Sequence, residues 1–174
     1  MSTRLVKGTA VVSLADGKKL GSIDRVYLDP ERKEIVGFSF HHGGLFGAKT
    51  TGMVDVSDVH AFGPDAVTVD DVTAVRSELA LEAHRDALID LEDLLKRKVL
   101  TEGGTFVGQV VSVRFAQDSY RLTAIEVSPG FFQENRLVPS QEVEQIGDEL
   151  IVVSDTVCSP VGQRPAERRL VRVA

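Results

Sequence analysis

The chain has a single cysteine, no tryptophan and no long apolar run. With Cys158 alone, an internal disulfide is excluded, and the absence of disulfides fits a reducing compartment. The apolar run nearest the N-terminus, 10–14, is too short for the core of a signal peptide. No other run approaches the roughly 18 residues that a membrane-spanning helix needs. The sequence therefore predicts a cytoplasmic protein without a transmembrane segment.

The chain also has fewer basic residues than acidic ones, which gives it a formal net charge of −6. The segment 164–174 holds four arginines against Glu167, so the rest of the chain is more acidic still. An acidic body repels phosphate backbones, and we therefore expect no direct DNA binding. The arginine-containing end is predicted to be a flexible solvated tail, with an anchor for an acidic partner or a lipid surface as the alternative.

An internal repeat organises most of the chain. Shifted by 87 positions, residues 16–40 lie over residues 103–127 without a gap, and both glycines of DGKKLG meet those of GGTFVG. Shifted by 84 positions, residues 54–69 fall on residues 138–153 with the same order of apolar, glycine and polar positions. A shared order of residue types is the signal that a duplicated fold leaves. The sequence therefore predicts two copies of one unit in tandem.

Each copy has the pattern of short β-strands separated by turn residues. In the first copy, the stretches rich in Val, Ile and Phe lie around 10–14, 20–28, 34–40, 52–56 and 66–69. The apolar alternation breaks between Ile23 and Val26, and at the same place in the second copy between Val110 and Val113. This break predicts a β-bulge or a sharp coil in each copy, and a glycine two residues earlier supplies the backbone freedom.

The segment 76–98 between the copies has apolar residues at three- and four-residue spacing, including Leu81, Leu88 and Leu95. Acidic residues near its start and the basic run 96–98 at its end suit a helix dipole. The pattern predicts a linking α-helix of about five turns. Its apolar stripe is expected to be covered by one barrel, by the other barrel, or by a second copy of the protein in a homodimer.

A family resemblance rests on the order of these features. A DGKKLG turn opens the first copy, a bulged strand follows, and VSDVHAFG leads into the last strand, while the second copy has the looser GGTFVG and QEVEQIG. This order resembles the PRC-barrel family over roughly Leu5–Asp70 and Leu95–Asp155, and the layout is similar to stand-alone bacterial proteins with two such barrels. Relatives in that family are the H subunit of the photosynthetic reaction centre and the second half of a ribosome maturation factor. The resemblance implies a docking or scaffold module and brings no catalytic residues.

The predicted fold is mainly β, with two small antiparallel PRC-type β-barrels joined by one α-helix. The expected boundaries are a first barrel at 1–75, the linking helix at 76–98, a second barrel at 99–155 and a partly flexible C-terminal tail at 156–174. Two modules of this size would each bury little apolar surface alone, so they are expected to gain stability by packing on each other.

Motifs that carry chemistry are incomplete. The segment GGLFGAKT at 43–50 nearly spells a P-loop, but Ala48 replaces the second glycine, and a strand rather than a helix is expected after it. His41 and His42 are adjacent, so on a strand they point to opposite faces and do not chelate one ion easily. We therefore predict that the protein is not an enzyme and that it has no catalytic residues, no cofactor and no metal site.

The loop in which the two copies differ in length carries an adjacent apolar pair in each copy, Leu-Phe in the first and Phe-Phe in the second. Such pairs either cap the open ends of the barrels or project as a docking surface, because exposed aromatic residues suit interface hot spots. Together with the helix stripe, the candidate protein-interaction residues are Leu45, Phe46, Phe131, Phe132, Leu81 and Leu88. The predicted function is a non-enzymatic adaptor or scaffold that binds a protein partner. The alternative is an RNA-processing or ribosome-associated factor, by analogy with the ribosome maturation factor.

Overall fold

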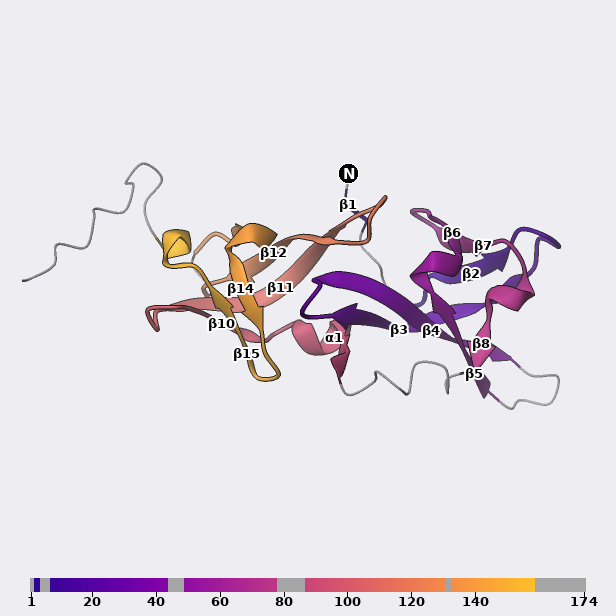
Figure 1. Cartoon of the computed structure of the whole chain (residues 1–174), viewed down its shortest axis with the longest axis horizontal. Coiled ribbons are helices and arrows are strands. Elements are labelled where there is room, and N and C mark those ends of the chain that lie inside the picture. Colours follow the sequence, from indigo (N-terminus) through magenta and orange to yellow (C-terminus); the bar gives the residue numbers. More distant parts are fainter. Residues whose placement is uncertain (1, 4–6, 44–48, 78–86, 131–132, 159–174) are drawn as a thin grey trace, which may run out of the picture.

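The computed structural model of the chain describes residues 2–3, 7–43, 49–77, 87–130 and 133–158. Two β-sheets lie side by side along the longest axis of the molecule, the first copy at one end and the second copy at the other (Figure 1). The prediction of a mainly β fold built from two copies is confirmed.

The first sheet has eight strands, with the order β6-β7-β2-β3-β4-β5-β8 and with β9 paired to β3. The strands are β2 (Ala10–Ser13), β3 (Lys19–Asp29), β4 (Glu34–Gly43), β5 (Lys49–Asp55), β6 (Val59–Phe62), β7 (Ala66–Val69), β8 (Arg76–Ser77) and β9 (Ile89–Asp90). Strand β5 begins at Lys49, inside the P-loop-like segment 43–50, and continues beyond it, so the expectation of a strand rather than a helix there is confirmed.

The second sheet has seven strands, with the order β13-β12-β11-β10-β15-β14 and with β1 paired to β11. The strands are β1 (Ser2–Thr3), β10 (Lys98–Thr101), β11 (Phe106–Ala116), β12 (Leu122–Ser128), β13 (Arg136–Pro139), β14 (Val143–Ile146) and β15 (Leu150–Val153). The long strands β3 and β11 coincide under the shift of 87 positions at both ends, which confirms the duplication.

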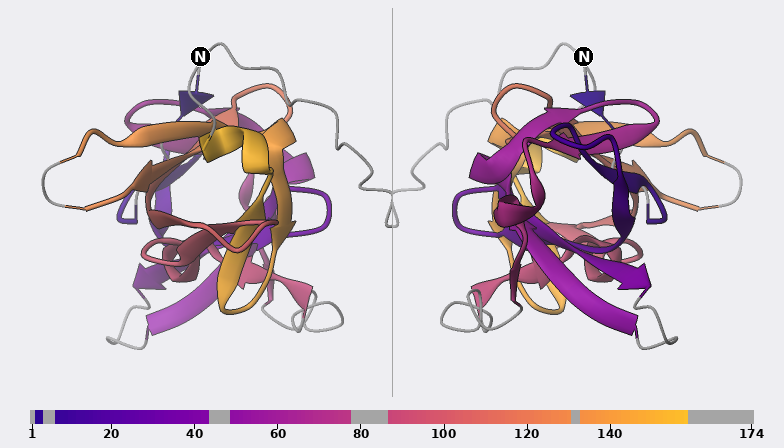
Figure 2. Two further views of the ribbon diagram at one scale, coloured as in Figure 1. Left: turned by 90° about the vertical axis from the view of Figure 1, so that its left-hand side faces the viewer. Right: turned by 90° about the vertical axis from the view of Figure 1, so that its right-hand side faces the viewer.

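The prediction of two antiparallel barrels is wrong in two respects. Each sheet contains one parallel pair, β2 with β7 and β10 with β15. In the described part of the chain, the sheets curve around the core (Figure 2) but do not close into barrels, because their outermost strands do not pair with each other. The sequence pattern reports which residues face inward, but it carries no signal for which sheet edges meet, so closure could not be read from it.

The predicted β-bulges are confirmed in both copies. The pairing register shifts between Ile23 and Arg25 in β3 and between Val110 and Ser112 in β11. A Cβ atom on Gly108 would lie 2.2 Å from the carbonyl oxygen of the neighbouring strand, and at the equivalent glycine of β3 the distance would be 2.3 Å. These two glycines therefore let adjacent strands approach closely at the bulge, which any side chain would prevent.

The linking α-helix predicted at 76–98 is wrong for the described residues. Only α1 (Leu91–Leu94) is helical, a single turn that the Asp90 side chain caps by accepting a hydrogen bond from the amide of Glu92 at 3.0 Å. Strand β8 directly precedes residues 78–86, which lie outside the described part of the chain, and β9 follows them. The turn buries Leu91 and Leu94 against the chain's own core. These two leucines of the predicted stripe are therefore covered by a single helical turn between the extended strands β9 and β10.

The remaining helical segments are single 3-10 turns, η1 (Val56–Asp58), η2 (Val72–Ala74), η5 (Ser140–Glu142) and η6 (Asp155–Cys158). Each lies in a connection or directly after a last strand, where it reverses the chain. Among the described residues, no helix has the length and apolar character needed to cross a membrane.

The two copies exchange their first strands. Strand β1 begins the first copy but pairs with β11 of the second, with Ser2 opposite Ala116. Strand β9 lies 87 positions after β1 and pairs with β3 of the first copy, with Ile89 opposite Leu28. In Figure 1, β1 accordingly lies beside β11, and the segment with α1 lies at the middle of the molecule, next to β3. Each of the long strands β3 and β11 therefore pairs with a short strand from the other copy, and we call these short strands, β1 and β9, the arms.

The tips of the β3-β4 and β11-β12 hairpins also cross each other. The amide of Ile35 donates to the carbonyl of Tyr120 at 2.9 Å, and the amide of Leu122 donates to the carbonyl of Lys33 at 2.7 Å. Both acceptor residues have positive φ angles, 54° for Lys33 and 55° for Tyr120, and they lie 87 positions apart. Because each bond is the counterpart of the other, the copies are related by an approximate two-fold axis within one chain.

One continuous hydrophobic core contains residues from both copies. At the crossing, the rings of Phe62 and Tyr120 meet edge to face with centroids 4.8 Å apart, and the side-chain amide of Gln117 donates to the carbonyl of Phe62 at 3.3 Å. The Lys33 ammonium donates to the carbonyl of Val143, also across the boundary. The copies therefore pack on each other through these contacts, and the expected gain in stability stays a prediction.

Replacing Gly108 with alanine tests the close approach of strands at the bulge. The added methyl group would overlap the carbonyl oxygen of Ser128 at a glycine whose φ is +150°. We expect a loss of about 3 kcal/mol in the free energy of unfolding, measured by urea denaturation. The matched control is Gly104→Ala, which has a positive φ of +82° but no atom within 4 Å of the new methyl group, and should lose about 1 kcal/mol. Equal losses in the two variants would show that the approach of the strands is not the constraint.

The shared core predicts that both copies unfold together. In differential scanning calorimetry, the calorimetric enthalpy should equal the van't Hoff enthalpy, as for one cooperative unit. Leu94 is fully buried on α1, so Leu94→Ala should lower the free energy of unfolding by about 2–5 kcal/mol. It should shift the whole transition to lower temperature. Two resolved transitions, of which only one responds to Leu94→Ala, would contradict the single core.

Candidate docking site between the copies

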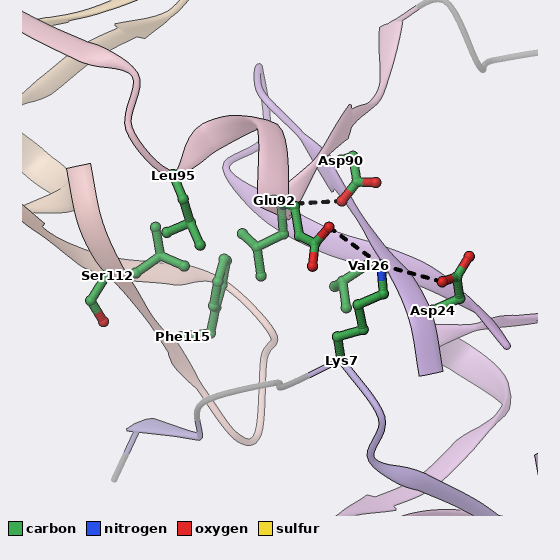
Figure 3. A pocket seen from close by; sticks show the side chains of 10 residues that line it. Lys7, Asp24, Val26, Asp90, Glu92, Leu95, Ser112 and Phe115 are labelled. Carbon is green, nitrogen blue, oxygen red and sulfur yellow. Dashed lines mark hydrogen bonds and ion pairs between the residues drawn. The ribbon is translucent and has the colours of Figure 1, made fainter. Parts of the chain in front are cut away.

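A cavity of about 420 Å³ lies between β3 and β11, beside α1 (Figure 3). We call it the junction pocket. Its volume falls within the range of cavities that hold small ligands or the side chains of a partner. Val26 and Val113 both line it, and they lie 87 positions apart. The junction pocket therefore straddles the approximate two-fold axis that relates the copies.

A second corresponding pair flanks the axis. The amide of Gly8 donates to a carbonyl of β3 at 2.8 Å, and the amide of Lys96 donates to the equivalent carbonyl of β11 at 2.7 Å. The preceding residues, Lys7 and Leu95, therefore occupy corresponding places, and both line the junction pocket. One is a cation and the other is an aliphatic side chain, so the pocket is symmetric in backbone and asymmetric in chemistry.

One side of the junction pocket is apolar. Leu95, Val113 and Phe115 form this apolar wall. Figure 3 shows Leu95 and Phe115 on this side, with Ser112 beside them. Val113 and Phe115 alternate along β11 and are mostly buried in the core, so their exposed edges form a rigid surface. An apolar wall of this kind binds hydrophobic groups without reorganising.

The opposite side, the charged wall, holds Lys7, Asp24, Asp90 and Glu92. The Lys7 ammonium lies 3.4 Å from a carboxylate oxygen of Asp24 and 3.5 Å from one of Glu92. The negative charges of Glu92 and then of Asp24 raise the pKa of Lys7 above its ordinary value. Asp24 also lies 3.2 Å from the Nε2 atom of His41. Three carboxylates against two cations, Lys7 and Arg25, leave this wall net negative by one charge.

Asp90 is the most buried group of the charged wall, with 13% of its side chain exposed. Burial raises the pKa of Asp90 above its ordinary value, although the hydrogen bond from the Glu92 amide acts in the opposite direction. The Nε atom of Arg25 lies 3.8 Å from the second carboxylate oxygen. A partly desolvated carboxylate at the edge of an apolar cavity favours a cation as its neighbour.

This arrangement is suited to binding a group that is apolar at one end and cationic at the other. Asp90 caps α1, and Asp24 and Glu92 share Lys7, so the carboxylates are held by structural contacts. Within the described residues, no group of three or more His, Cys, Asp or Glu side chains is placed to hold a metal ion.

Five of the six predicted interaction residues, Leu45, Phe46, Phe131, Phe132 and Leu81, lie outside the described residues. Leu88 is described: it is partly buried and directly precedes β9. The neighbouring leucines of its predicted stripe pack on the chain's own core, so the described part of that stripe presents no helix face to a second copy. A homodimer and the docking role of the two apolar pairs stay predictions.

The sequence reasoning did not single out the charged wall. Glu92 lies in the segment for which the sequence predicts a helix, and neither Glu92 nor Asp24 belongs to a motif that carries chemistry. The pocket forms only because Asp90 and Glu92, which begin the second copy, fold onto β3 of the first. One signal was present in the sequence, since Asp24 stands where the other copy has Val111.

The raised pKa of Asp90 gives a test of its burial. Asparagine retains the helix cap but carries no charge, so Asp90→Asn removes a carboxylate that ionises less readily in the folded chain than in the unfolded chain. The wild type should therefore lose stability relative to the variant as the pH rises through the ordinary and then the raised pKa. Urea unfolding from about pH 3 to about pH 7 measures the difference. The surface variant Asp65→Asn is the control, and a difference for Asp90→Asn that does not grow with pH would contradict the burial.

Comparison with known protein families agrees with this architecture. The PRC-barrel domain model matches the chain twice, at residues 1–76 and at residues 87–157. The second match begins just before β9, so it includes the arm that this copy extends onto the first. No curated protein matches the chain. The two matches together cover most of the chain, and the protein therefore belongs to the PRC-barrel domain family.

Proposed function

We propose that this PRC-barrel protein is a non-enzymatic adaptor that binds a protein partner in the junction pocket. The proposal rests on one observation: an apolar wall and a net negative wall face each other across one cavity. A binding role is favoured over a catalytic one because the carboxylates of the charged wall are engaged in a helix cap and in ion pairs with Lys7. The expected partner segment carries an aliphatic or aromatic side chain next to an arginine or lysine.

The apolar pairs in the loops extend the proposal to a second surface. Leu45 with Phe46, and Phe131 with Phe132, follow β4 and β12 in the sequence, where each copy connects to its next strand. Aromatic side chains at such connections would act as anchors for a partner held primarily by the junction pocket. An adaptor with two such surfaces would hold one partner along its length or join two partners.

The alternative, a factor that acts on RNA or on ribosomal particles, has less support. The chain carries a net charge of −6, and the charged wall would repel phosphate. Co-sedimentation with ribosomal subunits that weakens as salt rises is the observation that would favour this alternative over the adaptor.

Glu92→Lys tests the pocket as the partner-binding surface. The side chain is 55% exposed, so the fold should remain intact while the charged wall changes sign around Lys7. We expect a protein partner retained from a cell extract by the wild type to be lost, with at least about a tenfold fall in affinity. Glu144→Lys, an exposed charge reversal on β14, is the matched control and should retain the partner.

The same assay separates the two surfaces. If Phe131→Ala with Phe132→Ala loses the partner at an unchanged melting temperature while Glu92→Lys keeps it, the aromatic loop and not the junction pocket is the binding surface. Retention of every partner by both variants would contradict the adaptor proposal as a whole.

A further inference from the structure

The chain itself contains a segment whose chemistry complements the junction pocket. Within 164–174, RPAERRLVRVA, the apolar pair Leu170-Val171 lies between Arg169 and Arg172. This is the combination of a hydrophobic group beside cations that the two walls accommodate. The segment lies outside the described residues, and its four arginines against Glu167 give it a net positive charge opposite to that of the acidic body of the chain.

The charges are complementary. The ion pairs that Lys7 and Arg25 form on the charged wall have N–O separations of 3.4 to 3.9 Å, longer than strong charge-assisted hydrogen bonds. The carboxylates of Asp24, Asp90 and Glu92 therefore retain acceptor capacity. A guanidinium group presents several N–H donors in a fixed planar geometry, which suits closely spaced carboxylate oxygens better than an ammonium group does.

The apolar part also matches. Leu95, Val113 and Phe115 present a rigid hydrophobic face that one or two branched aliphatic side chains would cover. Leu170 and Val171 are of this kind, and no acidic residue lies within the run 168–174. A segment bound with its arginines toward the charged wall would bury these side chains on the apolar wall.

The described end of the chain starts close enough for this contact. The amide of Gly103 donates to a carboxylate oxygen of Asp155 at 2.9 Å, which holds η6 beside the far end of β10. From Thr101 at that end back to Leu95 in the pocket, an extended chain covers roughly 20 Å. The residues from 159 to 170 span up to about 40 Å when extended, so Leu170 reaches the pocket without strain.

Tethering strengthens a contact that would be weak between separate molecules. A short flexible connection gives the attached segment an effective concentration in the millimolar range. We infer that residues 164–174 occupy the junction pocket of their own chain and that a partner segment of similar chemistry must displace them. This inference rests on the proposed function, because it names what regulates access to that site.

Disulfide trapping in the full-length chain tests the inference. In a Cys158→Ser background, the pair Ser112→Cys with Leu170→Cys places one thiol beside the apolar wall and one in the arginine segment. A disulfide forms only when the two Cα atoms come within about 7 Å. The control pair is Glu144→Cys with Leu170→Cys. The amide of Ser154, directly before η6, donates to the carbonyl of Glu142, directly before β14, so the start of β14 lies near the described end of the chain and random motion of the segment would favour the control.

We expect the Ser112 pair to form an intramolecular disulfide at least about tenfold faster than the Glu144 pair. Reversing the charges with Arg168→Glu, Arg169→Glu and Arg172→Glu should bring its rate down to that of the control, and added salt should slow it. Equal rates for the two pairs, or a disulfide formed only between two molecules, would overturn the inference.

The outcomes also separate this inference from the proposed function. If the two pairs react equally while Glu92→Lys still loses the partner, the arginine segment does not occupy the pocket and the adaptor proposal stands. If the Ser112 pair reacts faster but Glu92→Lys retains every partner, the segment binds its own pocket and the pocket is not the adaptor surface.

Discussion

The reciprocal hydrogen bonds at the crossing of the two hairpins set the arrangement of the whole molecule. Each bond runs from a strand amide of one copy to the carbonyl of a residue with positive φ in the other, Lys33 or Tyr120. Two such bonds contribute only about 1 kcal/mol each. Burial of the side chains around them, such as Phe62, contributes more, roughly 2 kcal/mol for each large apolar group. The bonds therefore fix the register of the copies, while the shared core supplies most of the stability.

The junction pocket follows from that register. Because the copies meet about a two-fold axis, β3 and β11 face each other, and the arm of the second copy is carried onto β3 together with α1. The arm brings Asp90 and Glu92 opposite Phe115, residues that no local pattern would place together. An exchange of arms between copies thus makes a cavity that is lined by residues of both copies.

The sequence predicted what depends on local and periodic signals. The two copies, the strand positions and the bulges were read correctly, since Gly21 and Gly108 precede breaks in alternation that both copies share. The prediction failed where a segment is decided by long-range pairing. The spacing of leucines around Leu91 is that of an amphipathic helix. In the structure, however, Ile89 pairs with Leu28 in a sheet, and Asp90 is extended, so the helix begins only at Leu91. The charged wall was missed for the same reason, because it assembles from segments some 70 residues apart in sequence.

The chemistry of the pocket arises where the two copies have diverged. A symmetric junction would place like residues on both sides of the axis, as Val26 and Val113 still are. Instead Lys7 corresponds to Leu95, and Asp24 corresponds to Val111, so one wall is charged while the other is apolar. Carboxylates beside a hydrophobic core cost free energy unless a cation compensates them. Lys7 and Arg25 compensate only part of the charge of three carboxylates. The remaining negative charge favours a cationic neighbour at this junction, so the junction, rather than the repeated turns and strands, is the surface at which the proposed partner is to be tested.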